Sequence, residues 1–315
     1  MSLAVRYAIW GMVCVLAAAF IFVGSGFDFD YIIPNRLYRL AAIVIGGVCI
    51  AFSSITFQTI TENKILTPAI MGYEAVYVLF QSLLILFFGM ASQTLLGKNS
   101  NFLLSIAIML LYSWMIHRWL LRSEQNNVYL LLLVGLVLTL LINTLTQLIQ
   151  FTISPGEFSL LLGYSQASFN RAQPLQLLIT ATMVCGFCGV IWKALPTFDV
   201  LSLGRHQAMS LGVDYAAFIK RHFALIALLV AISTSLLGPT AFMGIFVANT
   251  AYALARVPKH RLTLSTGCAI AIAAFLFAQI LVEHVFNYKT TVGILVNLMC
   301  GVYFLVLVVR PRRAS

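Results

Sequence analysis

Residues 41–59 read AAIVIGGVCIAFSSITFQT and contain no charged side chain. A helix needs about 20 mostly apolar residues to cross the hydrocarbon core of a bilayer, so this stretch is long enough to span one. It carries small residues at Ala42, Gly46, Gly47, Ser53 and Ser54, and small residues four apart let helices approach closely. The stretch therefore predicts a transmembrane helix that is buried among other helices.

The whole chain shares this apolar character. Hydrophobic residues make up 61% of its 315 residues, charged residues make up 9%, and the mean hydropathy is +0.99. These values lie outside the range of soluble globular domains. At about 20 residues per crossing, there is room for roughly ten crossings and for no sizeable soluble domain. We therefore predict an all-α bundle of about ten transmembrane helices that forms a single domain over residues 1–315.

The apolar stretches give the expected position of each crossing. The predicted spans are 7–24, 38–59, 71–91, 101–121, 128–151, 174–193, 222–238, 242–255, 263–284 and 290–309. The span 242–255 is shorter than a normal crossing, so it is expected to be tilted, broken or screened by neighbouring helices. The first span is expected to be retained, because RYAIWGMVCVLAAAFIFVG at 6–24 is full length and lacks an A-x-A-like cleavage site.

The basic residues predict the orientation, because positively charged loops tend to stay in the cytoplasm. With ten spans and a cytoplasmic N-terminus, fourteen of the 19 Lys and Arg residues fall inside and five fall outside. The inner residues are Arg6, Lys64, Arg118, Arg122, Lys193, Arg205, Lys220, Arg221, Arg256, Lys259, Arg261, Arg310, Arg312 and Arg313. The outer residues are Arg36, Arg39, Lys98, Arg171 and Lys289. The net charge of +10 therefore indicates topology, with both termini inside, and not nucleic-acid binding.

The sequence offers no recognisable metal, cofactor or catalytic site. Cys185 and Cys188 have the C-x-x-C spacing, but a second pair and nearby His ligands are missing, so we interpret them as small helix residues. The segment SQTLLGKNS at 92–100 lacks the first Gly and the Ser/Thr of a phosphate-binding loop. The middle of the spans holds no acids for a proton relay. Uphill transport by this chain would therefore need an energy source on a partner.

The span 128–151 carries polar residues on one helical face. Thr139, Asn143, Gln147 and Gln150 follow one another at offsets of three and four, with Thr146 as an alternative to Gln147. A neutral polar stripe can line a water-filled passage for a bulky solute, or it can hydrogen-bond neighbouring helices. The residues alone favour the second interpretation slightly and leave both open.

Arg36 and Arg39 lie three residues apart at the outer end of the span 38–59. Two cations at a helix N-terminus oppose the positive end of the helix dipole and break the positive-inside trend. An anionic group outside should compensate them. Two sources are open, namely a lipid phosphate and a carboxylate on an external partner.

Six motifs stand in a fixed order along the chain. They are RLYR at 36–39, FQTITENKILTPAIMGYEA at 57–75, LGRHQAMSLGV at 203–213, GPTAFMGIFV at 238–247, HR at 260–261 and TVG at 291–293. In this order they resemble the FecCD-type permease subunits, the membrane components of bacterial ABC importers for iron-siderophores, haem and cobalamin. The resemblance covers nearly the whole chain, and several ordered motifs carry more weight than any one of them.

The resemblance implies a type II ABC importer permease in the bacterial inner membrane, multi-pass, with both termini in the cytoplasm. It implies two permease subunits around a central path, two cytoplasmic ATPase subunits and a periplasmic siderophore-binding protein. It also implies that the cytoplasmic segment 197–217 contains short coupling helices that sit in a groove of the ATPase. Gly204 and Gly212 would bound this element, and Ala208 and Leu211 would offer a small apolar face. The expected coupling residues are Leu203, Gly204, Arg205, Gln207, Ala208, Leu211 and Gly212.

The resemblance assigns roles to the arginine pair and to the polar stripe as well. Arg36 and Arg39 would meet glutamates of the binding protein, since a planar guanidinium can hold a carboxylate bidentately. The stripe of Thr139, Asn143, Gln147 and Gln150 would border the path between the two permease subunits. No catalytic residue, cofactor or metal cage is expected in this chain, because the iron would stay inside its chelate.

The expected function is passage of a ferric siderophore through a permease that is not itself an enzyme. The wording of the TENKILTP and IMGYE segments resembles the branch that serves catecholate-type siderophores and pairs two different permease chains. The residues at 63–66 (NKIL) replace the usual N-P-L-A, Ala248 and Asn249 replace the usual P-H, and Glu283 stands where many members have an outward arginine. Docking is therefore expected to rest on Arg36, Arg39 and a second permease chain.

Other functions remain as alternatives. A haem or cobalamin importer permease would carry the same motifs. A secondary transporter would couple an ion gradient through Glu74, Glu283 or His284, but these residues lie near span ends rather than at midplane. A membrane-embedded enzyme would need convergent nucleophiles, acids or metal ligands, and the sequence shows none.

Overall fold

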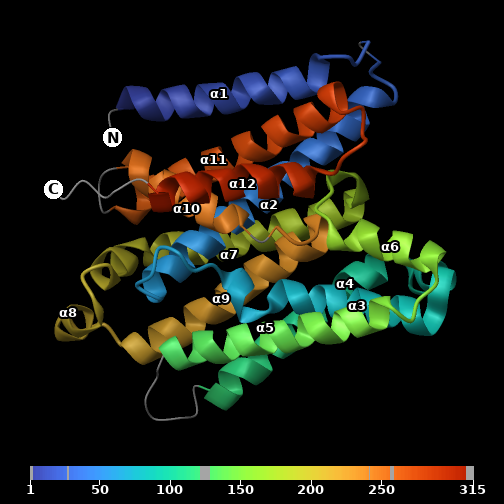
Figure 1. The fold of residues 1–315 in the computed structure, drawn as a ribbon. Helices are drawn as coiled ribbons and strands as arrows, with labels where there is room; N and C mark the ends of the chain where they lie inside the picture. The colour runs from blue at the N-terminus through green and yellow to red at the C-terminus, as the bar shows by residue number, and fades with distance from the viewer. Residues whose placement is uncertain (1–2, 27, 121–127, 241, 256–258, 310–315) are drawn as a thin grey trace.

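The computed structural model describes residues 3–26, 28–120, 128–240, 242–255 and 259–309. Within these residues the chain forms twelve α-helices, and no strand is assigned (Figure 1). They are α1 (Leu3–Phe22), α2 (Ile32–Ile60), α3 (Tyr73–Phe88), α4 (Ser92–Leu120), α5 (Val128–Gln150), α6 (Pro155–Ser165), α7 (Pro174–Leu201), α8 (Arg205–Ser210), α9 (Tyr215–Leu237), α10 (Met243–Ala255), α11 (His260–Ile280) and α12 (Val292–Val309). Short 3₁₀ turns cover Pro68–Met71, Gly89–Ala91 and Phe169–Arg171, and a π-helical turn covers Leu281–Val285.

The predicted all-α membrane bundle is confirmed. Eight helices are long and apolar enough to cross a membrane, and two shorter apolar stretches follow at Met243–Ala255 and Val292–Val306. Each of the ten predicted spans corresponds to one helix, while α6 and α8 are short additional helices. The chain is thus a multi-pass membrane protein.

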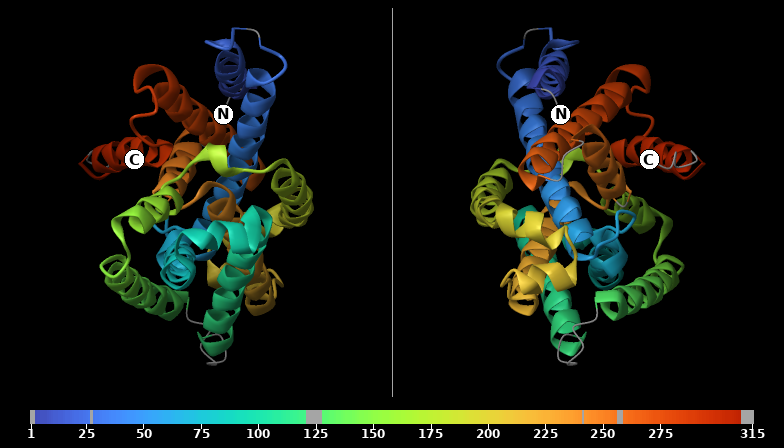
Figure 2. Two further views of the ribbon diagram at one scale, coloured as in Figure 1. Left: turned by 90° about the vertical axis from the view of Figure 1, so that its right-hand side faces the viewer. Right: turned by 90° about the vertical axis from the view of Figure 1, so that its left-hand side faces the viewer.

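Helix α2 lies at the centre of the bundle and packs against α9, α11, α10 and α7 (Figures 1 and 2). Buried residues make up 78% of the apolar window in α2 and in α11, against 11% in α1 and 17% in α5. A Cβ atom at Gly46 would lie 2.1 Å from Leu237 Cδ1, and one at Gly47 would lie 3.2 Å from the backbone N of Ile272. The close helix approach predicted from the small residues of α2 is therefore confirmed.

Several helices extend beyond the predicted spans. Helix α2 begins at Ile32 instead of 38, α9 begins at Tyr215 instead of 222, and α7 continues through Pro196 to Leu201. Helix α4 begins at Ser92 and changes direction at Gly97, whose φ of 66° and ψ of 155° are non-helical. Apolar length predicts only the part of a helix within the hydrocarbon, so polar ends are missed. The end of the predicted span 101–121 and Arg122, Arg256, Arg310, Arg312 and Arg313 lie outside the described residues.

The two ends of the bundle carry different elements. The first turn of α1 and the last described turn of α12 lie at the same end as α8, and we call this the α8 end (Figure 1). The connection between α1 and α2, together with α6, lies at the opposite end, which we call the α6 end. The first and last described helical turns therefore lie on one side of the bundle, and the assignment of that side to the cytoplasm stays a prediction.

Candidate functional site

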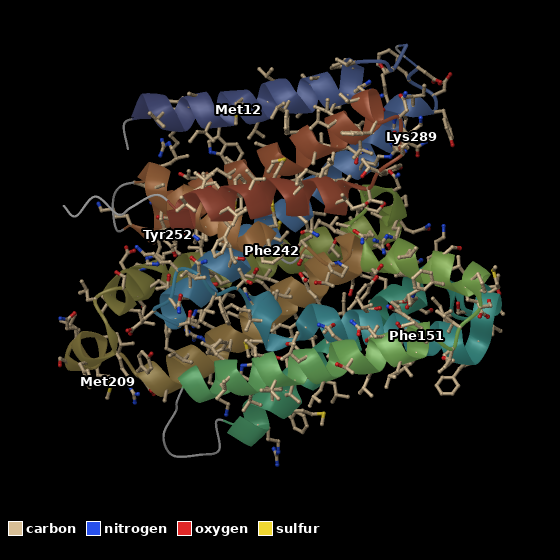
Figure 3. All side chains as sticks on the ribbon, in the orientation of Figure 1. Met12, Phe151, Met209, Phe242, Tyr252 and Lys289 are labelled. Carbon is tan, nitrogen blue, oxygen red and sulfur yellow. The ribbon has the colours of Figure 1, made fainter. Side chains whose placement is uncertain are left out.

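A groove lies where α3, α5 and the start of α10 meet, and we call it the central groove. Its volume is about 380 Å³. The polar groups on its wall are Thr67, Glu74, Thr139, Asn143 and Ser165, and Ile70, Pro239 and Phe242 are among its apolar residues. Phe242 is 51% exposed and lies near the middle of the bundle (Figure 3).

The wall of the groove formed by Pro68–Met71 is held by hydrogen bonds from two neighbouring helices. Tyr112 Oη of α4 donates to the carbonyl of Met71 at 2.9 Å, and Thr139 Oγ1 of α5 donates to that of Ile70 at 3.0 Å. The next residue, Gly72, has a φ of +86°, and a Cβ there would lie 2.5 Å from Tyr112 Oη. Only glycine fits this turn, because it has no side chain to clash and adopts positive φ freely.

Glu74 connects the groove to a second motif. It lies in the first turn of α3, and its Oε1 accepts hydrogen bonds from the backbone N of Thr240 at 3.1 Å and from Thr240 Oγ1 at 3.5 Å. The carboxylate therefore joins IMGYE to the GPT turn, which lie 166 residues apart in the chain. Sequence reasoning considered Glu74 only for ion coupling and missed its place on this wall, although its position inside one of the six motifs was a usable signal.

The polar stripe of α5 divides in the structure. Thr139 and Asn143 line the central groove, whereas Gln147 and Gln150 are absent from its wall. Thr139 Oγ1 also donates to Gly135 O at 2.7 Å, so this hydroxyl serves helix packing as well. Asn143 is exposed and makes no side-chain hydrogen bond with any residue that the structure describes. Thr146 is 4% exposed and faces the interior, which leaves Gln147 as the exposed member of that pair.

Arg36 turns inward at the α6 end. It is 4% exposed, and its Nη1 donates to the carbonyls of Phe20, Ile21 and Val23 at 2.8, 3.1 and 2.6 Å. Its Nη2 forms a hydrogen-bonded ion pair with Glu283. The guanidinium therefore caps the C-terminus of α1, where a cation is stabilised by the helix dipole.

The expectation that both arginines face an external partner is wrong for Arg36, because its side chain is buried and both of its terminal nitrogens bind groups of the chain itself. The compensating anion is Glu283, from the π-helical turn after α11, and not an external group. Arg39 is half-buried and donates weakly to Tyr288 Oη at 3.3 Å. Docking of a partner at Arg39 stays a prediction.

The segment 203–213 forms the short helix α8 at the α8 end. The backbone N of Arg205 donates to Glu62 Oε1 at 3.1 Å, which ties α8 to the residues just after α2. Gly204 and Gly212 flank the helix with φ values of +103° and +85°, so the expected glycine boundaries are present. Arg205 and Gln207 are exposed, and the apolar Leu203, Met209 and Leu211 are 58%, 52% and 63% exposed.

The burial of Ala208 differs from the expectation that it faces a partner. Its side chain is fully buried against the chain itself, so it cannot present an apolar face to a partner. A helix as short as α8 is held down by its buried side, and the small residue lies on that side. The apolar groups available to a partner are those of Leu203, Met209 and Leu211.

A second hydrogen-bonded group fixes the base of α8. Asp199, near the end of α7, accepts hydrogen bonds from Nδ1 and from the backbone N of His260 at 2.6 and 2.8 Å. His260 Nε2 lies 2.8 Å from Thr59 Oγ1 of α2. This chain of contacts joins α7, α11 and α2, and it explains structurally why a histidine begins α11 in the HR motif.

Known proteins with similar sequences identify the family of the chain. The chain matches the FecCD transport family over residues 3–310. It is 37% identical to the petrobactin import system permease protein YclO of Bacillus subtilis, over 96% of each chain. It is 32% identical to the permease protein FatC of Bacillus anthracis, also of a petrobactin import system, over 90% of this chain and 80% of the relative.

One relative of lower sequence identity and one solved structure also match the chain. The chain is 25% identical to the hemin transport system permease protein HmuU of Yersinia pestis, over 88% of this chain and 82% of that one. A solved structure, described as an inward-facing conformation of a metal-chelate type ABC transporter, superposes with a TM-score of 0.85. It is 18% identical and covers 98% of this chain and 99% of that one, so the likeness concerns the fold.

Proposed function

The chain belongs to the FecCD transport family, and from that premise we infer that it is the permease subunit of an ATP-driven importer of ferric siderophores. The chain is a transport component and not an enzyme. Its relatives YclO and FatC, which are named for petrobactin import, support a siderophore as cargo. A catecholate-bearing siderophore is the cargo class we propose, and haem, supported by HmuU, is the second candidate.

The central groove is the observation that carries the proposal within this chain. It brings together two of the six motif segments, 57–75 and 238–247, and it exposes Asn143 and Phe242 on a wall whose one acid, Glu74, is hydrogen-bonded to Thr240. A weakly binding wall suits a cargo that must be released on the other side. We propose that the groove of this chain and that of a second permease chain together form the translocation path.

The exposed face of α5 suits such a second permease chain. Large apolar side chains project from it with no covering element in the described chain, and they are Leu133, Leu136, Leu140, Leu141, Leu145 and Leu148. Asn143 and Gln147 are exposed among them. A helix with both kinds of residue fits a position where lipid, a second subunit and a wet passage meet.

We propose that one of the two cytoplasmic ATPase subunits binds α8 of this chain, with the α8 end in the cytoplasm of a bacterial cell and the protein in its inner membrane. The exposed Leu203, Met209 and Leu211 give the helix an apolar surface for a groove on the ATPase. Glu62 and the Asp199–His260 pair would transmit a displacement of α8 to α2, α7 and α11. A periplasmic siderophore-binding protein would dock at the α6 end, with Arg39 as the available cation.

The experiment that tests the proposal combines uptake with thiol labelling. Cells that produce the whole importer with this chain should accumulate radioactive iron from a ferric catecholate siderophore, and cells without the chain should not. In the reconstituted importer, Asn143→Cys should react with a water-soluble thiol reagent, and its rate should change when ATP is trapped. Thr146→Cys, one turn along the same helix and buried, is the matched control and should stay unlabelled.

Siderophore-dependent uptake together with labelling of Asn143→Cys would support the proposal. An Asn143→Cys variant that is protected from the reagent in every state would exclude the groove as a water-filled path. Uptake of iron from haem but not from the siderophore would favour the second candidate. The exposed Cys14 and Cys185 and the half-buried Cys188 must first be replaced.

A further inference from the structure

A second and larger cavity lies at the α6 end, between α3, α4, α6 and the start of α7, and we call it the α6 cavity. Its volume is about 680 Å³, which is within the usual range of small-molecule sites, roughly 300–1,000 Å³. It shares no lining residue with the central groove. Lys98 and Asn170 on its wall are exposed, so the cavity opens to the surface.

The charge of this wall has one sign. Lys98 and Arg171 are its two cations, and the other polar groups that line it are uncharged amides and hydroxyls. Among the described residues, Arg171 takes part in no ion pair with a carboxylate. A cation in a partly enclosed space without a counter-ion gives a local positive potential, which attracts anions.

Two polar atoms at this wall have unused hydrogen-bonding capacity. Arg171 Nη2 donates to the carbonyls of Gln166 and Leu237, the second at 3.0 Å, but the N–H at Nε is buried and has no described partner. Ser235 Oγ is also buried without a described partner and lines the same cavity. Buried polar groups are nearly always hydrogen-bonded in proteins, so an unsatisfied charged donor and an unsatisfied hydroxyl that line one cavity indicate a place for an oxygen acceptor.

Two motif glycines hold the segment that carries Arg171. Gly238 has a φ of +98°, and a Cβ there would lie 2.8 Å from both Arg171 Nη2 and Gln166 O. A Cβ at Gly293 would lie 2.9 Å from the backbone N of Ala167. The segment 166–171 is thus held from both sides, and its guanidinium also lies over the ring of Tyr164 at 5.6 Å. A fixed donor loses little freedom when it binds a ligand.

From this geometry we propose that the α6 cavity is a binding site for an oxyanion group, a carboxylate or a phosphate, held by Arg171 and Lys98. The group could come from a water-soluble carboxylate ligand, including an anionic metal chelate, or from a phospholipid headgroup. The site belongs to a single permease chain and does not depend on which cargo the importer carries.

The test measures the local potential and its neutralisation in the complete importer, in nanodiscs of phosphatidylcholine. A reporter thiol is placed by Ser159→Cys, an exposed position on the wall, after replacement of Cys14, Cys185 and Cys188. Its reaction rates with an anionic and a cationic thiosulfonate are compared. We expect Arg171→Gln to lower the anionic-to-cationic rate ratio about fivefold, and Lys98→Gln to lower it by a smaller factor. Arg171→Lys should keep most of the ratio.

Lys289→Gln is the matched control, because Lys289 is an exposed cation at the same end that does not line the cavity; it should leave the ratio unchanged. Lys98→Gln also keeps the test valid if Arg171→Gln fails to fold.

Protection of the thiol by citrate in phosphatidylcholine discs would identify a soluble carboxylate as the ligand. Protection only after phosphatidylglycerol is added would identify a lipid phosphate. An unchanged ratio in both Gln variants, or no protection by citrate or by the anionic lipid, would overturn the proposal.

Discussion

Arg36 and Arg205 both lie close to the start of a helix, one at each end of the bundle, yet their side chains are used differently. The guanidinium of Arg36 is buried, with three carbonyls and Glu283 as partners. The guanidinium of Arg205 is exposed and lies over the ring of Tyr215 at 5.3 Å, while only its backbone N–H binds Glu62. The α6 end thus uses its cation for folding, and the α8 end leaves its cation free for a partner.

The comparison predicts that the largest effect follows from Glu283→Ala. This change leaves Arg36 buried without its carboxylate, and breaking a buried pair on one side costs about 3–5 kcal/mol. The apparent unfolding temperature of the detergent-purified protein should fall sharply, and its yield in the membrane should drop. Arg39→Gln is the control, and it should keep the wild-type unfolding temperature. Equal stability of the two variants would show that the Arg36–Glu283 pair does not hold the α6 end together.

The α8 end offers a matched pair of substitutions with opposite outcomes. Ala208→Glu places a charge at a fully buried position, so we expect it to unfold α8 or the protein, at a cost of about 3 kcal/mol or more. Leu211→Glu, at a 63% exposed position, should leave the unfolding temperature nearly unchanged but abolish co-purification of the ATPase. Normal ATPase association and normal substrate-stimulated hydrolysis in Leu211→Glu would remove α8 from the coupling surface.

Gly212 and Gly238 both have a positive φ, so the stability cost of replacing each by alanine can be compared between the two ends. Gly212→Ala should cost about 1 kcal/mol through backbone conformation alone, because nothing lies within 4 Å of its Cβ position. Gly238→Ala should cost about 3 kcal/mol, because its Cβ also meets Arg171 and Gln166 at 2.8 Å. The difference in the unfolding free energies of the two variants measures how tightly the segment 166–171 is packed. A zero difference would mean that this segment yields easily.

The smallest effect concerns Glu157, a half-buried acid at the α6 end. The backbone N–H and hydroxyl of Ser154 bind Glu157 and lower the pKa of its carboxyl below the usual 4.5. A lowered pKa in the folded state stabilises the helix start above the unfolded pKa, and this contribution is lost as the pH falls through the folded pKa. Hydrogen exchange at the start of α6, corrected for intrinsic rates, should therefore accelerate below pH 4.5. Glu157→Gln should remove that pH dependence while the rest of the protein is unaffected.

The sequence predicted the spans and the short helix α8 well, but it missed α6. Ten apolar stretches became ten helices because length and hydropathy are properties of each segment alone. Helix α6 was left as a connection, since its eleven residues are too few to cross a bilayer. The capping box of Ser154 and Glu157, visible as S-x-x-E before Leu160, was the signal that could have found it.

The site residues were harder because their roles depend on distant partners. Arg36 was expected to face outward, but its carboxylate partner lies 247 residues away, in a π-helical turn that no local pattern predicts. Ala208 lies in α8 and Leu211 directly follows it, three residues on, and only the packing of this segment on the chain distinguishes the buried residue from the exposed one. The exposure of Asn143 and the glycine boundaries of α8 are as expected, since helical periodicity and positive φ are local, while the roles of these residues stay predictions.

Helix α2 joins the two ends that have been compared. Its 29 residues form a rod about 44 Å long, with Arg36 in the first turns and Glu62 just beyond the last. The helix connects Glu62, which binds the start of α8, to Arg36, which binds the C-terminus of α1 and Glu283 after α11. We therefore expect a displacement of α8 to reach the opposite end of the bundle through this single helix, which contributes no residue to the central groove.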